Sequence, residues 1–257
     1  MSKIEEYRGK LRGLRSRDEY LLASSGLPGP RGNIELAQAA ADVLDGKTFL
    51  RYLAFTADRA PTNTPEEFLA FCGTVGLGRL AAEGDDGALR RLRAQASDTR
   101  WRVREGTAMA LQRLGDVDMS RLVREMTIWA GGSPLEQRAA AAALCEPRLL
   151  KQPESAAAAL EILDRITSSV STSTDRGGEG FVALRKGLGY CWSVAVVALP
   201  GVGKPLMEKW LHCTDRDVRW IMKENLGKSR LLRMDPAWVE RCRATLLRPL
   251  QGRGRRA

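Results

Sequence analysis

An arginine recurs at a similar place in four helical segments, and this recurrence constrains the fold more than any other feature of the chain. The residues are Arg104, Arg138, Arg185 and Arg219, at intervals of 34, 47 and 34 residues. An arginine beside an apolar helical stripe buries its stem and sends its guanidinium to a neighbouring helix end or carboxylate. A period of this length in helical sequence is typical of stacked helix pairs. The sequence therefore predicts an all-α fold, namely a right-handed α-solenoid of about five or six helix pairs.

Residues 98–115 show what each repeat is expected to contain. Asp98 is expected to cap the helix, since its carboxylate would accept a free backbone N–H of the first turn. Gly115 is expected to end the helix. Between them an apolar stripe recurs at helical spacing, formed by Val103, Thr107, Ala110, Leu111 and Leu114. The alternative, a helical domain without repeats in which the four arginines are unrelated, remains open.

Composition divides the chain into three segments. Residues 1–32 combine a basic amphipathic helix with a Pro/Gly loop, because Pro28 and Pro30 lack backbone donors. Residues 33–250 are expected to form the helical array, and residues 251–257 are expected to be a disordered basic tail. Caps and prolines place helix starts near Asn33, Thr64-Pro65, Met119, Pro134 and Pro153, with further helices at about 181–199, 203–213, 216–228 and 236–247. The run 167–180, rich in Ser, Thr and Gly, is expected to be a mobile loop.

Positive charge is concentrated in two parts of the chain. The net charge is +10, and residues 88–113 carry +5 while residues 204–257 carry +8. Clustered positive charge is typical of proteins that bind a polyanion. The alternative is a well-solvated surface in a protein from an arginine-rich proteome, which by itself would raise the isoelectric point.

Several classes of protein are not indicated. No convincing alternating strand pattern occurs, and we expect no apolar stretch to reach the ~20 residues of a bilayer span. The N-terminal residues do not resemble a signal peptide, so we expect a cytoplasmic protein without a membrane partner. The five cysteines contain no CxxC pair, so neither a zinc site nor a disulfide framework is indicated. We expect no cofactor and no metal site.

The sequence offers few residues for catalysis. His212 is the single histidine and lies near an expected helix end, where a structural or capping role is favoured over general-base work. The run Gly201-Val202-Gly203-Lys204 resembles the end of a phosphate-binding loop, but the glycine that should begin such a loop is replaced by Val196. No nucleophile elbow is present. The chain is therefore expected to bind rather than to catalyse.

Tryptophans and cations together give the candidate binding residues. An arginine beside an exposed indole can hold a phosphate while the ring stacks on a base or sugar. We favour a packing role for Trp129, Trp192, Trp210 and Trp238, whereas Trp101 and Trp220 lie near helix starts beside arginines. The expected nucleic-acid-binding residues are Arg90, Arg91, Arg93, Arg100, Trp101, Arg102, Arg216, Trp220, Lys223, Lys228 and Arg230.

Two runs resemble a known family. Ser97-Asp98-Thr99-Arg100-Trp101-Arg102-Val103-Arg104-Glu105 and Arg185-Lys186-Gly187-Leu188-Gly189-Tyr190-Cys191-Trp192 are similar to segments of the HEAT-like DNA-alkylation-repeat glycosylases. The resemblance implies HEAT-like helix pairs and a basic concave groove that cups duplex DNA. It also implies that Asp98, which stands where the family has its Asp, would assist loss of an alkylated base. The structural alternative for Asp98 is the helix cap described above, and we favour it over a catalytic role.

The sequence thus favours a non-catalytic HEAT-like α-solenoid that binds DNA or another polyanion through a basic concave surface lined by Arg and Trp. One alternative is a protein–protein interaction scaffold, in which an acidic or apolar partner occupies that surface. A further alternative is an alkylated-base DNA glycosylase that uses Asp98.

Overall fold

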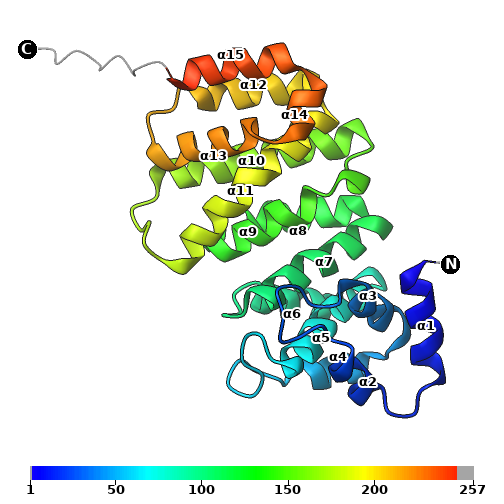
Figure 1. Cartoon of the computed structure of the whole chain (residues 1–257). Helices are drawn as coiled ribbons and strands as arrows, with labels where there is room; N and C mark the ends of the chain where they lie inside the picture. Colours follow the sequence, from blue (N-terminus) through cyan, green and yellow to red (C-terminus); the bar gives the residue numbers. More distant parts are fainter. Residues whose placement is uncertain (1, 248–257) are drawn as a thin grey trace, which may run out of the picture. The chain divides into compact units, whose positions relative to one another are not determined.

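All regular secondary structure is helical in residues 2–247, which a computed structural model describes (Figure 1). Fifteen α-helices and one 3-10 turn occur in this range, and no β-strand is found within it. The predicted all-α class is confirmed. Contacts divide the chain into two compact units, Met1–Leu122 (unit 1) and Val123–Ala257 (unit 2). The division falls inside α8 (Met119–Trp129), and each unit is described by itself.

Unit 1 is built from alternate helices that pack side by side. In chain order its helices are α1 (Lys3–Gly13), α2 (Arg17–Ala23), α3 (Ile34–Val43), α4 (Gly46–Leu53), α5 (Pro65–Ala82), α6 (Asp86–Gln95) and α7 (Trp101–Val117). Helix α3 packs between α1 and α5, and α5 packs in turn against α7. Helices α2, α4 and α6 also pack against α5. Helix α5 is therefore the centre of unit 1.

Local sequence signals account for most helix starts in unit 1. The side chain of Asn33 accepts the Leu36 N–H, and that of Thr64 accepts the Glu67 N–H. Pro65 follows as the first residue of α5, where its missing N–H costs nothing. Both caps were predicted and are confirmed.

Close approach of α5 to its neighbours depends on glycine. A Cβ added at Gly78 would lie 2.3 Å from the carbonyl oxygen of Ala110 on α7. A Cβ at Gly76 would lie 2.3 Å from the ring of Phe49 on α4. These glycines let the backbone of α5 touch α7 and the Phe49 ring directly, which explains how α5 is buried along most of its length.

Unit 2 repeats this alternation. Its helices are α9 (Pro134–Leu144), α10 (Pro153–Thr172), α11 (Glu179–Ala198), α12 (Pro200–Leu211), α13 (Arg216–Leu226), α14 (Ser229–Met234) and α15 (Pro236–Leu247), with a 3-10 turn, η1, at Pro147–Leu149. Helix α11 packs between α9 and α13, while α10 packs against α12. In Figure 1 these helices run from green at α9 to red at α15.

Helix α11 lies at the centre of unit 2. It contacts α9, α10, α12, α13 and α14. By length and composition alone it could cross a membrane, which differs from the expectation that no segment reaches that length, but more than half of it is buried inside the protein. A buried central helix passes the same test of length and composition as a membrane span.

Several predicted boundaries differ from the structure. Helix α10 continues to Thr172, so the loop expected at 167–180 covers only residues 173–178. Helix α7 continues past Gly115 to Val117, and α14 was missed because its six residues show too little periodicity. The expected tail at 251–257 lies outside the described residues.

The recurring arginines occupy similar but not identical places. Arg104 and Arg219 are each the fourth residue of their helix, α7 and α13, whereas Arg138 and Arg185 lie one and three residues further in. Arg104 donates to the carbonyl oxygens of Asp98 and Thr99, just before its own helix. Arg219 donates to Leu211 at the end of α12. The expected contact with a neighbouring helix end is confirmed for Arg219, and Arg104 makes a comparable contact with the turn after α6.

Asp18 makes unit 1 sensitive to acid. A hydrogen bond from Arg51, joined by one from Tyr52, lowers the pKa of the Asp18 carboxyl below its usual value of 3.8. Because the folded-state pKa lies below the unfolded one, the contribution is full above about pH 4 and is lost as pH falls through the folded pKa. We expect Asp18→Asn to destabilise unit 1 near neutral pH, and the difference from wild type to shrink toward about pH 2 in urea melts. A difference independent of pH would contradict this assignment.

Candidate functional site

The eleven predicted binding residues fall into two groups, one in each unit. Unit 1 holds Arg90, Arg91, Arg93, Arg100, Trp101 and Arg102, and unit 2 holds Arg216, Trp220, Lys223, Lys228 and Arg230. The first group divides into exposed and buried members. Arg90, Arg91 and Arg93 are exposed on α6, and the Trp101 side chain is 47% exposed at the start of α7.

Arg100 is not a surface residue, contrary to the prediction. It is 2% exposed, and its guanidinium donates to both carboxylate oxygens of Asp98 at 2.7 and 2.9 Å. Its Nη1 also donates to the carbonyl oxygens of Phe55 and Ala60. The guanidinium is therefore used to join the loop after α4 to the start of α7, and it has no surface left for a phosphate.

Arg102 is likewise buried, contrary to the prediction. Its Nη1 lies 3.1 Å from Oε2 of the fully buried Glu67, and its Nη2 donates to the Gly29 carbonyl at 2.6 Å and to Asn63 at 3.3 Å. The guanidinium also lies 4.4 Å from the Trp101 ring centroid. Arg102 thus ties the Pro/Gly loop of residues 24–33 to α5 and α7.

Asp98 has a structural role that differs from the predicted cap. The N-terminal cap of α7 is Arg100, and Asp98 lies two residues earlier, where it accepts the Arg100 N–H at 2.8 Å. The Arg100 guanidinium occupies both carboxylate oxygens of Asp98 as well. Both carboxylate oxygens of Asp98 are therefore engaged by its neighbour Arg100, and the side chain is only 15% exposed.

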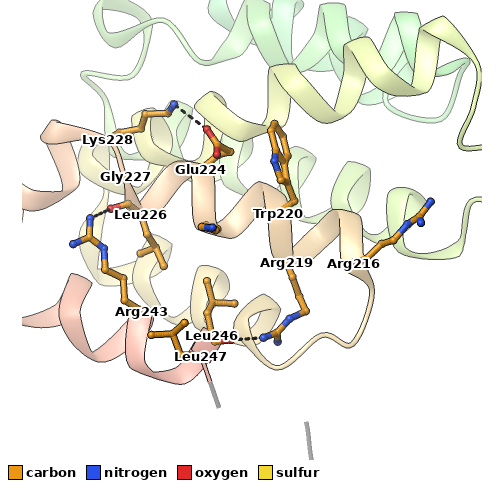
Figure 2. A pocket seen from close by; sticks show the side chains of 11 residues that line it. Arg216, Arg219, Trp220, Glu224, Leu226, Gly227, Lys228, Arg243, Leu246 and Leu247 are labelled. Carbon is orange, nitrogen blue, oxygen red and sulfur yellow. Dashed lines mark hydrogen bonds and ion pairs between the residues drawn. The ribbon is translucent and has the colours of Figure 1, made fainter. Parts of the chain in front are cut away.

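In unit 2 the predicted residues converge on one pocket of about 690 Å³ (Figure 2). Arg216, Trp220, Lys223 and Lys228 all line it. The volume lies within the range of about 300–1,000 Å³ that is usual for small-molecule sites. Arg230 is the exception among the predicted residues of unit 2, because it donates to the Tyr190 hydroxyl and stacks on that ring at 4.5 Å, outside the pocket.

Helical spacing explains why α13 presents these residues together. Arg216, Trp220 and Lys223 are separated by four and three residues, which places them on one face of a helix. The opposite face buries Val218, Ile221, Met222 and Asn225. Asn225 fixes α13 to α11, since its side chain accepts the Ser193 N–H at 2.8 Å and donates to the Leu188 carbonyl at 2.8 Å. The basic face of α13 is therefore held rigidly outward.

Helix α15 supplies the second wall of the pocket and residues that the sequence analysis missed. Arg243, Leu246 and Leu247 line the pocket from α15, and Arg219 and Leu226 join them from α13. Figure 2 shows Arg219 reaching across to the Leu246 carbonyl, while Arg243 reaches back to the Leu226 carbonyl at 2.9 Å. Two arginines thus cross between the helices, with leucine side chains lining the same pocket. Nothing local in the sequence pairs α13 with α15.

The residues that line the pocket carry an excess of positive charge, part of which is compensated from outside the lining, since Arg216 lies 3.5 Å from Asp217 and Arg243 lies 2.7 Å from Glu240. Its lining contains five cations, Arg216, Arg219, Lys223, Lys228 and Arg243, and one carboxylate, Glu224. Among the residues that the structure describes, the Lys223 ammonium has no ion pair or hydrogen bond. The hydrogen bonds of Arg219 go to neutral carbonyls, so its charge is not compensated there. Lys228 lies 3.8 Å from Glu224, a distance at which the pair is weak.

The Trp220 ring is held in place by contacts with α11. The Arg185 guanidinium lies 4.1 Å from its centroid, and a Cβ at Gly189 would come within 3.2 Å of the ring. Arg185 is in turn fixed by Asp217, whose Oδ1 lies 3.1 Å from Nε. Asp217 also pairs with Arg176 at 2.7 Å. The recurring arginine of α11 therefore positions the aromatic side chain of the pocket.

Other predicted features have structural roles. Trp129, Trp192, Trp210 and Trp238 are 0–7% exposed, which confirms their packing role. Lys204, at the end of the phosphate-loop-like run, lies inside α12 and pairs with Asp235 at 2.7 Å.

Cys72, Cys145, Cys191 and Cys242 are buried, and burial raises the pKa of the Cys242 thiol to about 11. Within residues 2–247 no cluster of three His, Cys, Asp or Glu side chains could hold a metal ion.

Comparisons with known proteins give no relative from which a function could be inferred. No family model matches the chain, and neither a curated protein nor a solved structure matches it.

Proposed function

We propose that the chain is a non-catalytic binding protein that holds DNA or another polyanion, and that the pocket between α13 and α15 is its main contact. The observation that carries this proposal is the lining of that pocket, five cations against a single carboxylate. Sequence-independent binding to nucleic acid depends on such cations, which neutralise phosphates and release condensed counterions.

The proposed architecture is a HEAT-like one. In each unit alternate helices pack on one another, α3 on α5 on α7 and α9 on α11 on α13, as expected for stacked helix pairs. We propose that the units are built from about five or six such pairs with a right-handed turn. The similarity of residues 97–105 and 185–192 to DNA-alkylation-repeat proteins supports this arrangement.

The surroundings of Asp98 favour binding over catalysis. Both of its carboxylate oxygens accept hydrogen bonds from the neighbouring Arg100, and the side chain is 15% exposed. A base that assists loss of an alkylated nucleobase must reach the substrate within hydrogen-bond distance. A release assay on methylated DNA tests the alternative directly, and activity lost in Asp98→Asn would favour the glycosylase.

The salt dependence of binding tests the proposed function. We expect the full-length protein to bind a dye-labelled oligonucleotide, with an affinity that falls by roughly 10²-fold between about 50 and 200 mM salt if the five pocket cations each contact a phosphate. Lys223→Ala is expected to weaken binding and to reduce the salt slope by about one. Fluorescence anisotropy titrations across a salt series measure both quantities.

Lys151→Ala is the matched control, because it removes one exposed lysine of unit 2 that does not line the pocket. It is expected to leave the slope nearly unchanged. No binding at low salt would overturn the proposal. Tight binding to an acidic protein segment in place of nucleic acid would instead favour the interaction scaffold.

A further inference from the structure

We propose that the pocket takes single-stranded nucleic acid, with one base inserted against Trp220 and the adjacent phosphates on Arg216 and Lys223. The inference rests on the proposed function and specifies its ligand. The observation behind it is an aromatic ring placed midway between two cations on one helix face and inside a concave pocket with apolar walls.

The apolar part of the pocket is not needed for contacts with the phosphates and sugars of an intact duplex. Contacts with a duplex backbone are made to phosphates and sugars, which need cations on an open surface. This pocket is also lined by Leu246, Leu247 and Trp220, whereas Leu226 is buried (1% exposed) and offers its backbone carbonyl to Arg243. Leu247 is 84% exposed, so it offers an apolar surface to whatever occupies the pocket. Single-stranded nucleic acid fits both parts of the lining, because an unstacked base can contact the apolar residues while the phosphates contact the cations.

The arrangement along α13 fits a strand that follows the helix. With a rise of about 1.5 Å per residue, Arg216 and Lys223 lie roughly 10 Å apart along the axis, and Trp220 lies between them. Arg185 does not line the pocket, so it covers the ring from a side that the pocket does not use. This support holds the indole in one orientation before binding, which lowers the entropy lost when a base stacks on it.

Figure 2 shows that Trp220 and Arg219 leave α13 in different directions, with Arg219 toward Leu246. Arg219 donates to the Leu211 and Leu246 carbonyls, and Arg243 donates to the Leu226 carbonyl and to Glu240. Each guanidinium keeps further N–H groups that can reach a phosphate on the α15 side of the pocket. The strand is thus expected to be held by stacking at one place and by charge on both sides of it.

Three dye-labelled probes of about twelve nucleotides test the inference with the full-length protein. They are a single strand, the same strand without bases, and a duplex of the same sequence. We expect the base-bearing strand to bind about tenfold more tightly than the abasic strand and more tightly than the duplex, at about 50 mM salt. Equal affinity for the base-bearing and abasic strands, or for the strand and the duplex, would overturn the inference and leave polyanion binding intact. If the protein binds none of the three probes, the proposed function itself is overturned.

Trp220→Leu locates the effect. We expect it to lower affinity for the base-bearing strand by about tenfold and to leave affinity for the abasic strand unchanged. Tyr190→Leu is the matched control, since Tyr190 is also an aromatic ring under an arginine in unit 2 but does not line the pocket. An equal loss in both variants would contradict the assignment to Trp220. If Trp220→Leu is misfolded by circular dichroism, the comparison of wild-type affinities for the three probes still decides the inference.

Discussion

Replacing Arg102 with Met is expected to lower the free energy of unfolding of unit 1 by about 3–5 kcal/mol. The substitution leaves the Glu67 carboxylate, which is fully buried, without its cationic partner. An unpaired charge in such a place is far more costly than the loss of a surface ion pair. It also removes the donors to Gly29 and Asn63 that hold the Pro/Gly loop. Urea unfolding followed by circular dichroism measures the change.

A second substitution separates the cost of the orphaned charge from the loss of contacts. Arg102→Met combined with Glu67→Leu is expected to recover part of the stability, because it removes both charges. Recovery stays incomplete since Glu67 also accepts the Asn63 N–H at 2.7 Å. Arg91→Ala, at an exposed residue of α6, is expected to change stability by no more than about 0.5 kcal/mol. A loss in Arg102→Met as small as that would mean that the buried pair does not stabilise unit 1.

Gly78→Ala is expected to destabilise unit 1 by about 1–3 kcal/mol, toward the upper end because backbone atoms are overlapped. The added Cβ would lie 2.3 Å from the Ala110 carbonyl oxygen and 2.6 Å from its Cα. These are backbone atoms of α7, so no side-chain rotation relieves the overlap and the two helices must separate. The same urea titration measures the loss, and α7 amides should exchange hydrogen faster in the variant.

Gly9→Ala is the control for Gly78→Ala. Gly9 lies inside α1, and nothing stands within 4 Å of the place a Cβ would take. There the substitution is expected to stabilise the protein by about 0.5–1 kcal/mol, because alanine loses less backbone entropy than glycine. Opposite signs for the same chemical change would show that close packing of α5 and α7, and not helix propensity, sets the effect at Gly78.

Helix positions were predictable because their signals are local. Asn33 and Thr64 cap the helices that follow them by hydrogen bonds to residues three positions away. The helical stripe of Arg216, Trp220 and Lys223 could also be predicted, since it depends only on the spacing within α13. The tertiary contacts that these helices make with distant parts of the chain could not be predicted, because they leave no local signal in the sequence.

Arg100 and Arg102 illustrate what a single sequence does not contain. Besides the carboxylates of Asp98 and Glu67, they bind the backbone carbonyls of Phe55, Ala60 and Gly29, which lie 40 to 73 residues away and carry no side-chain signature. An arginine in a basic run therefore resembles a phosphate ligand until the fold is known. Arg219 and Arg243 were missed as pocket residues for the related reason that the pairing of α13 with α15 is a tertiary contact.

The central place of α11 has a consequence for synthesis of the chain. Its 20 residues leave the ribosome after α9 and α10 but before α12, α13 and α14, three of the helices that cover it. Until residues near 234 have emerged, the nascent chain presents an apolar segment with only part of its final cover. Such a segment is prone to aggregate or to bind a chaperone. Truncations that end between Ala198 and Arg216 should therefore be the least soluble forms of this protein.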